Sequence, residues 1–252
     1  MTTVEDAEET EWVDAMAGAS VATIAMTSAP PARVVLYPRS IYSRPVKRSA
    51  YGQRPWLWWD RRMISSERSD IEIRTYPDLA NLPRVEVIEE LYASASRLPP
   101  LSEAPEVAHS FARLYGYARQ RNDVVGVGVL VSGNLVGFAY GHPWSWESET
   151  DVWSQQLRHR LGPDSAALID ESFAVLLLAV HPAAGRRGLG AVLLESLMNG
   201  SNAQTHWLQT TDFETPALRL YLRMRYRSLG HGPDAPNGKP GLVLIHTRND
   251  AR

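Results

Sequence analysis

The sequence predicts a mixed α/β (α+β) fold in which helices flank a central sheet. Residues 173–180 are eight apolar residues in a row, which indicates a strand buried on both faces and therefore central in its sheet. Residues 124–131 and 135–140 are β-rich runs joined by a short Ser-Gly-Asn turn, as in a hairpin. Amphipathic segments of helical period lie between the strands. We therefore expect one sheet with helices packed against it.

The other elements follow from apolar spacing and from the residues that begin or end helices. Alternation of apolar and polar residues predicts the first strand, and apolar residues three and four apart predict the helices. Thr215 and Pro216 are typical of an N-cap and a first helical turn. The predicted elements are a strand at 71–76, helices before Pro99 and at 105–121, the hairpin, a short helix at 152–161 within the polar stretch 141–170, the strand 173–180, a helix at 189–198, a strand at 207–210, the helix from 215, and a strand at 242–246.

Composition and charge limit which functions and which domain organisation the sequence allows. The 252 residues include no cysteine, which excludes a disulfide framework, a zinc–thiolate or iron–sulfur site and a thiol nucleophile. The net charge of -2 gives no overall bias toward nucleic acid or an anionic membrane. However, residues 1–32 carry six acids and no base, and residues 33–68 carry nine bases and two acids. We expect an N-terminal extension over 1–69, acidic then basic and partly irregular, and one domain over 70–252.

The extension offers little readable chemistry. Residues 34–37 suit a short strand, and the cluster of Trp56, Trp58 and Trp59 is predicted to pack on the main domain or to form a partner surface. The first residues lack the bases of an export signal, and no run approaches the roughly 18 apolar residues of a membrane span. We therefore expect a cytoplasmic protein without a membrane partner.

A glycine-rich turn joins the buried strand to the helix after it. Gly185, Gly188 and Gly190 allow backbone N–H groups to converge at a helix N-terminus, which favours a pyrophosphate, and Arg186 and Arg187 can contact outlying phosphates. A P-loop would need Gly-Lys-Ser/Thr, and a dinucleotide fingerprint would need GxGxxG, so neither motif fits. Glycine-rich turns also precede helices for purely structural reasons, and that alternative stays open.

Two segments resemble the GNAT N-acetyltransferase superfamily over about the last 180 residues. VHPAAGRRGLG is similar to the acetyl-CoA-binding motif, with Gly188 and Gly190 at its two small positions and Gly185 where Gln or Arg is usual. TPALRLYLRMRYRSLG is similar to a second segment of the family, with Ala217 and Tyr221 matching. The resemblance implies a GNAT-like mixed central sheet and acetyl-CoA as co-substrate. The implied co-substrate contacts are Leu178, Ala179, Val180, Arg186, Arg187, Gly188, Leu189, Gly190 and Ala191.

Acetyl transfer to an amine needs loss of an amine proton, stabilisation of the carbonyl oxygen and protonation of the leaving thiolate. The resemblance implies that Tyr221 is the acid, although a core tyrosine is the alternative. Glu171, at the entrance to the buried strand, is the first candidate base. Other candidate bases remain open, namely Asp170, Glu214, His142 and His181. It also remains open whether a base is needed, since several members of the family take up the amine in its neutral form.

Substrate choice is expected to lie in the variable parts of the chain, which are the two early helices and the polar insertion at 142–170. The insertion carries Trp144, Trp146 and several acids, and acids beside aromatic rings suit a cationic amine, whereas a solvated loop is the alternative. Trp144, Trp146 and Glu214 are the candidate substrate contacts. The histidines show no paired metal-ligand spacing, so we expect no metal.

The sequence thus favours an acetyl-CoA-dependent N-acetyltransferase that moves an acetyl group to a primary amine by direct transfer in a ternary complex. One alternative is a non-catalytic CoA-binding or regulatory module, and another is an acetyltransferase acting on a peptide or an aminoacyl-tRNA. The acceptor is expected to be a small-molecule or peptide amine. Nucleic acid is a less favoured partner, and a homodimer is compatible with the resemblance.

Overall fold

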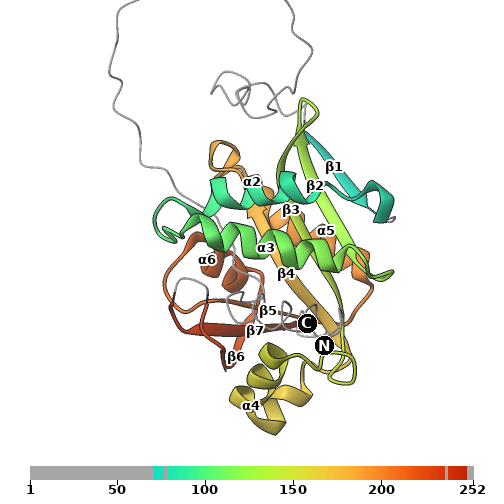
Figure 1. The fold of residues 1–252 in the computed structure, drawn as a ribbon, viewed down its shortest axis with the longest axis vertical. Coiled ribbons are helices and arrows are strands. Elements are labelled where there is room, and N and C mark those ends of the chain that lie inside the picture. Colours follow the sequence, from blue (N-terminus) through green and yellow to red (C-terminus); the bar gives the residue numbers. More distant parts are fainter. Residues whose placement is uncertain (1–70, 77–78, 236–237, 249–252) are drawn as a thin grey trace, which may run out of the picture.

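The computed structural model describes residues 71–76, 79–235 and 238–248 (Figure 1). Its strands are β1 (Ile71–Tyr76), β2 (Val125–Val131), β3 (Asn134–Trp144), β4 (Ser172–Val180), β5 (Thr205–Thr211), β6 (Arg227–Gly232) and β7 (Gly241–Thr247). Its α-helices are α2 (Val85–Ser96), α3 (Pro105–Ala118), α4 (Val152–Ala167), α5 (Leu189–Ser201) and α6 (Pro216–Arg223). The predicted mixed α/β class is confirmed.

The seven described strands form one sheet in the order β1-β2-β3-β4-β5-β7-β6. The pair β4–β5 is parallel and the other neighbours are antiparallel. β4 lies in the middle, and all nine of its residues are buried, as the unbroken apolar run predicts. The hairpin of β2 and β3 is also confirmed.

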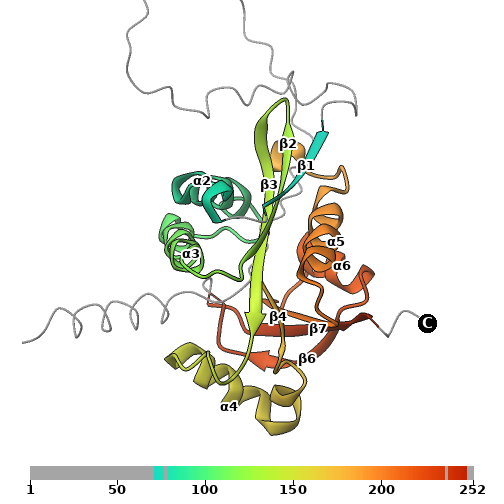
Figure 2. The ribbon, with the colours of Figure 1, turned by 90° about the vertical axis from the view of Figure 1, so that its right-hand side faces the viewer.

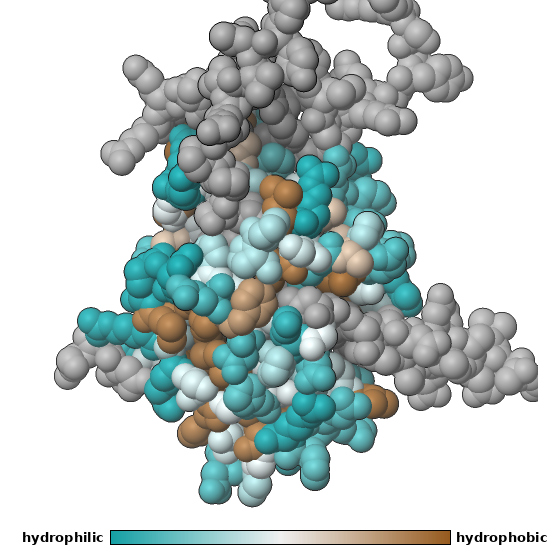
Figure 3. Space-filling model, turned by 90° about the vertical axis from the view of Figure 1, so that its left-hand side faces the viewer, coloured by the Kyte–Doolittle hydropathy of each residue, from teal (hydrophilic) through white to brown (hydrophobic). Residues whose placement is uncertain are grey.

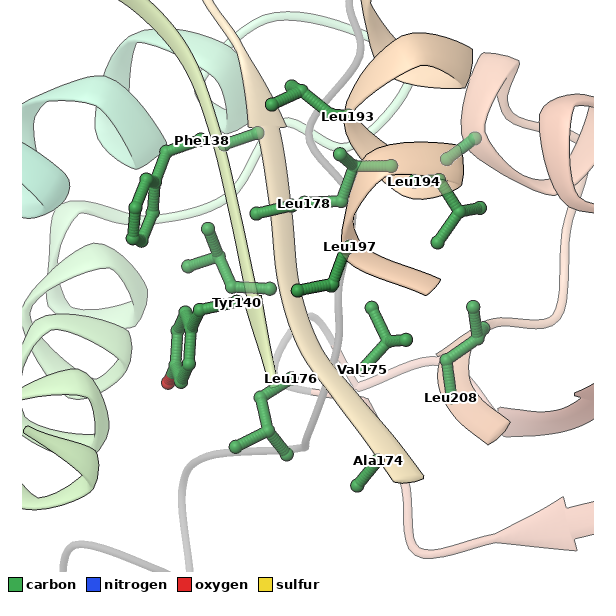
Figure 4. Close-up of a cluster of buried hydrophobic side chains, with 14 of the residues drawn as sticks. Phe138, Tyr140, Ala174, Val175, Leu176, Leu178, Leu193, Leu194, Leu197 and Leu208 are labelled. Carbon is green, nitrogen blue, oxygen red and sulfur yellow. The ribbon is translucent and has the colours of Figure 1, made fainter. Parts of the chain in front are cut away.

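Helices cover both faces of the sheet, as Figure 2 shows with the sheet nearly edge-on. Helices α2 and α3 pack on one face, and α5 and α6 lie on the other. In Figure 4, Leu193, Leu194 and Leu197 of α5 lie on one side of β4, and the rings of Phe138 and Tyr140 lie on the other. The apolar core therefore has two layers, one on each side of the sheet.

The structure differs from the predicted elements in three places. Strand β6 was not predicted, because its sequence RSLGHG has no apolar alternation; it is an edge strand ordered by pairing with β7. Strand β3 continues to Trp144, into the stretch predicted to be polar loop. Helix α4 runs past residue 161 to Ala167, with a kink at Gly162 (φ 72°) ahead of Pro163. The side chain of Asp151 caps its first turn.

The predicted extension over residues 1–69, with its strand at 34–37 and its tryptophan cluster, lies outside the described residues. Within the residues described, no helix is both long and apolar enough to cross a membrane. Figure 3 shows one face of the molecule, on which apolar residues form small patches between hydrophilic ones. Among the residues that the structure describes, the exposed large apolar side chains are spread over several elements; they are Ile73, Leu98, Val152, Leu168 and Leu222.

Candidate active site

The two parallel strands at the centre of the sheet part from one another along their length. β4 and β5 pair only at Phe173–His206 and Ala174–Trp207, near the beginning of each strand. Beyond Ala174, β4 has no partner in β5, although β5 stays paired with β7 over its whole length. The β5-facing edge of β4 beyond Ala174 therefore carries backbone N–H and C=O groups that the β4–β5 ladder does not pair.

A bulge in β4 lies just where the strands part. Tyr140 pairs with Leu177 and Gly141 pairs with Val175, so Leu176 is an extra residue on β4. In Figure 4 the side chain of Leu176 lies on the same side of β4 as Tyr140, and Val175 lies on the other side. Bulges of this kind turn a strand and redirect its side chains, and they are frequent beside active sites.

The glycine turn after β4 ends at the N-terminus of α5. Gly188 is the N-cap and adopts a left-handed conformation (φ 77°), and no side chain caps the helix. Within the described chain, the amide of Ala191 donates to the carbonyl of Gly188 at 3.0 Å, and the amide of Val192 donates to the same carbonyl at 3.2 Å. These are the first amides of the helix that have a backbone acceptor. Among the described residues, the amides of Leu189 and Gly190 therefore have no acceptor. Together with the helix dipole they form a site that favours an anion.

A cavity of about 200 Å³ opens at this turn, between α5 and α6. Six of the nine predicted co-substrate residues line it, namely Val180, Arg186, Gly188, Leu189, Gly190 and Ala191. Leu178, Ala179 and Arg187 do not line it. The far wall comes from α6 and includes Arg219 and Arg223. The cavity thus joins three guanidinium groups to the unpaired amides, an arrangement that fits a polyphosphate ligand.

Sequence inspection missed the α6 wall of this cavity. Arg219 and Arg223 are four residues apart, so they lie on one face of α6, and this spacing was the available signal. Glu214 lies just before the same helix; its side chain is 75% exposed and pairs with Arg219 at 2.6 Å. Glu214 itself does not line the cavity.

Tyr221 is buried completely on the inner face of α6. Its hydroxyl has no hydrogen-bond partner among the described residues, and its ring centroid is 5.5 Å from that of Tyr226. Burial raises the pKa of Tyr221 well above its ordinary value, and the nearby Tyr226 raises it further. The side chain is therefore neutral at physiological pH and keeps a proton that it can donate. Tyr221 does not line the cavity, but the preceding residue, Leu220, does.

The structure places the candidate bases in different environments. Glu171 is exposed at the start of β4, whereas the glycine turn follows the end of that strand. Asp170 accepts the backbone N–H of Trp146 at 3.0 Å. His181 caps the turn after β4 by accepting the amide of Ala183. Burial, with a contribution from Arg97, lowers the pKa of His181 to about 4.

His142 is buried on β3 and lines a second cavity, on the α3 side of the sheet. Burial lowers its pKa to about 4. Trp144 lines the same cavity. Trp146 does not; its indole donates to the carbonyl of Ala166 at 2.9 Å, and the guanidinium of Arg158 covers its ring at 5.5 Å. Of these two tryptophans, Trp144 thus lines the second cavity and Trp146 does not.

The described residues include no group of three or more His, Asp or Glu side chains that could hold a metal ion. The pyrophosphate of acetyl-CoA, the co-substrate implied by the sequence resemblance, suits the first cavity, because unpaired amides and guanidinium groups lie there. The unpaired edge of β4 suits its amide-containing arm.

Comparisons with known proteins include solved structures of low sequence identity. YncA from Salmonella typhimurium, with its cofactor acetyl-CoA, has a TM-score of 0.48 at 17% identity and covers 71% of this chain and 94% of its own. An N-acetyltransferase from Staphylococcus aureus has a TM-score of 0.48 at 12% identity and covers 71% of this chain and 98% of its own. PaiA N-acetyltransferase from Thermoplasma acidophilum, in complex with coenzyme A, has a TM-score of 0.46 at 14% identity and covers 70% of this chain and 98% of its own.

No curated protein sequence matches the chain. A family model does: the one described as Acetyltransferase (GNAT) family matches residues 86–226, which is more than half of the 252 residues. That range contains β4, the glycine turn, α5 and α6, which line the first cavity. The chain therefore belongs to the GNAT acetyltransferase family.

Proposed function

We propose that the protein is an acetyl-CoA-dependent N-acetyltransferase that moves the acetyl group directly to a primary amine. The observation that carries this proposal is the α5 N-terminus, where unpaired amides, left-handed Gly188 and three arginines surround a cavity at the end of the splayed strand β4. The family implies acyl transfer, and the cavity supplies a place for a thioester donor that carries phosphates.

In this proposal, each part of the site has one task. The amides of Leu189 and Gly190 and the side chain of Arg186 bind the pyrophosphate, and Arg219 and Arg223 bind further phosphate oxygens from α6. The free edge of β4 from Val175 onward hydrogen-bonds the arm of the donor and directs its thioester toward the bulge at Leu176. Acetyl-CoA, when bound in this site, would supply the acetyl group as a thioester.

Tyr221 is proposed to protonate the leaving thiolate. Support comes from its unpaired hydroxyl, since an unpaired buried hydroxyl is costly unless a ligand uses it. Glu171 is four residues before Val175, or about 13 Å of extended chain. The proposed chemistry therefore does not rely on Glu171 as the base.

Calorimetry with acetyl-CoA tests the binding half of the proposal. The wild type should bind in the micromolar range, and Arg223→Ala should bind about tenfold more weakly, because it loses one charge-assisted hydrogen bond. Arg84→Ala is the matched control, since Arg84 is exposed and begins α2 on the other face of the sheet. Absence of binding, or equal weakening by both variants, contradicts the proposal.

CoA release measured over a panel of amines tests the catalytic half. Release above the rate of thioester hydrolysis with at least one amine is the expected result. Tight acetyl-CoA binding without release for any small amine, peptide or aminoacyl-tRNA would instead identify a non-catalytic CoA-binding module.

A further inference from the structure

The second cavity lies on the side of the sheet away from α5. Its volume is about 170 Å³, and its walls come from α3, β3, α4 and the bulge residue of β4. Most of the wall is aromatic or aliphatic, including Leu114, Tyr140, Trp144, Trp153 and Leu176. Trp144 and Trp153 pack edge to face with centroids 6.5 Å apart, which makes this part of the wall rigid. The cavity thus suits an apolar ligand body.

The cavity meets the splayed strands at the bulge. Leu176 is the extra residue of β4 and also lines the cavity. In the β3–β4 ladder, Tyr140 pairs with Leu177 and His142 pairs with Ala174, so both of these cavity residues flank Leu176. A ligand in the cavity therefore lies beside the part of β4 where the proposed thioester ends.

The tautomer of His142, which lines the cavity, follows from its hydrogen bond. Its Nδ1 is 2.7 Å from the carbonyl oxygen of Pro143, which can only accept, so Nδ1 carries the proton and donates. Nε2 is then the unprotonated nitrogen of a neutral ring, and the hydrogen bond that the described residues make with His142 is to Nδ1. Burial, the main cause, and the nearby Arg121 keep the ring neutral by lowering its pKa. His142 can thus accept a hydrogen bond from an N–H group in the cavity.

The charges near the cavity favour a cation. Arg121 pairs with Glu149 at 3.1 Å and with Asp123 at 2.9 Å, so one guanidinium faces two carboxylates. Glu149 and Arg121 both line the cavity, and the side chain of Glu149 is only 14% exposed. When both acids are ionised, the cluster carries one excess negative charge, and the aromatic faces add attraction for an ammonium group.

The size of the cavity limits what it can hold. A dry cavity of about 150 Å³ lined by apolar side chains binds benzene. A cavity of about 170 Å³ therefore has room for one ring and a short chain. Most of an aminoglycoside would lie outside a space of this volume, and a second ammonium group placed against the aromatic part of the wall would lose its hydration.

We propose that this cavity is the acceptor site and that the acceptor is a small primary monoamine with an aromatic body, whose nitrogen donates to His142 Nε2. This inference rests on the proposed function. The amine nitrogen, neutral after losing one proton to solvent, forms the C–N bond with its lone pair, and the C–S bond breaks with its electrons on sulfur. The second nitrogen proton passes to His142, sulfur takes one proton from Tyr221, and exchange with solvent restores both residues.

The test compares CoA release with 2-phenylethylamine, spermidine, kanamycin and a lysine-containing peptide at equal concentration. We expect kcat/KM for 2-phenylethylamine to exceed that of the others at least tenfold. Ala118→Leu places extra volume in the cavity wall at the end of α3, and it should raise KM for 2-phenylethylamine at least tenfold while leaving the Kd of acetyl-CoA unchanged. Ala104→Leu, the same substitution at an exposed position before that helix, should change neither value.

His142→Gln tests the position of the amine. Gln can still accept a hydrogen bond but is a much poorer base, so we expect a lower kcat with a smaller change in KM. A preference for spermidine, kanamycin or the peptide, or an Ala118→Leu variant with unchanged KM, overturns the inference and leaves the proposed function intact. No release with any amine together with no binding of acetyl-CoA overturns the proposed function itself.

Discussion

Gly188→Ala should separate the anion-binding role of the glycine turn from its role in folding. Gly188 has φ 77°, and a Cβ at this position meets no atom within 4 Å. The variant is therefore destabilised by the left-handed backbone conformation and not by a steric clash. That cost is about 1–2 kcal/mol. For a protein of this size it corresponds to a fall in Tm of roughly 2–8 °C.

The same substitution should also weaken the binding of acetyl-CoA. If the turn relaxes toward an ordinary conformation, the amides of Leu189 and Gly190 move away from the phosphate position. Each hydrogen bond to a charged group is worth about 1.5–3 kcal/mol, so loss of one gives a roughly 10- to 100-fold rise in Kd. Calorimetric titration with acetyl-CoA measures the Kd, and thermal unfolding without ligand measures the stability.

Gly133→Ala is the matched control. Gly133 has φ 79° in the β2–β3 turn, and its added Cβ also meets nothing within 4 Å. Both variants should lose a similar amount of stability, and only Gly188→Ala should lose affinity. The reasoning is refuted if the two variants bind acetyl-CoA equally well, or if Gly188→Ala binds weakly with no loss of Tm.

Three further predictions concern single side chains. Tyr221→Phe should lower kcat by roughly 10²- to 10⁴-fold if its hydroxyl is the acid; Kd for acetyl-CoA should not change, and an unchanged kcat in steady-state assays would remove Tyr221 from the mechanism. Burial raises the pKa of Glu103 to about 7, although the 2.8 Å hydrogen bond from Tyr92 opposes the shift. The folded protein therefore holds this proton more tightly than the unfolded chain, so its contribution is complete below about pH 4.5 and is lost as the pH rises through 7. Urea unfolding of Glu103→Gln should accordingly show a shallower loss of stability between these pH values than the wild type, and parallel curves would contradict the assignment. Arg223→Ala should flatten the salt dependence of acetyl-CoA binding relative to Arg84→Ala, because it removes one phosphate contact; equal dependence in titrations at low and high salt would place Arg223 outside the site.

Much of the fold could be predicted because the signals are local. The unbroken apolar run of β4 requires burial on both faces, and the hairpin turn and the cap at Thr215 act within a few residues. Strand β6 escaped prediction because an exposed edge strand has no apolar pattern of its own and is ordered by pairing with β7.

The candidate site shows the same division. The glycine turn was readable because its small residues, its arginines and the helix behind them are contiguous in the chain. The arginines of α6 that complete the first cavity were not singled out, since the sequence does not show that α6 faces α5. Trp144 and Trp146 look alike in sequence, yet of the two only Trp144 lines the second cavity. The ring of Trp146 is covered by Arg158, and its indole N–H donates to the carbonyl of Ala166.

The sequence by itself determined the alternation of strands and helices, the central place of β4 and the glycine-rich turn after it. Each of these depends on burial or backbone conformation within one short segment. Only the tertiary structure decided the splay of β4 from β5, the bulge at Leu176 and the second cavity that adjoins it. These features arise where strands and helices distant in the chain meet, and no local pattern encodes which surfaces will face each other.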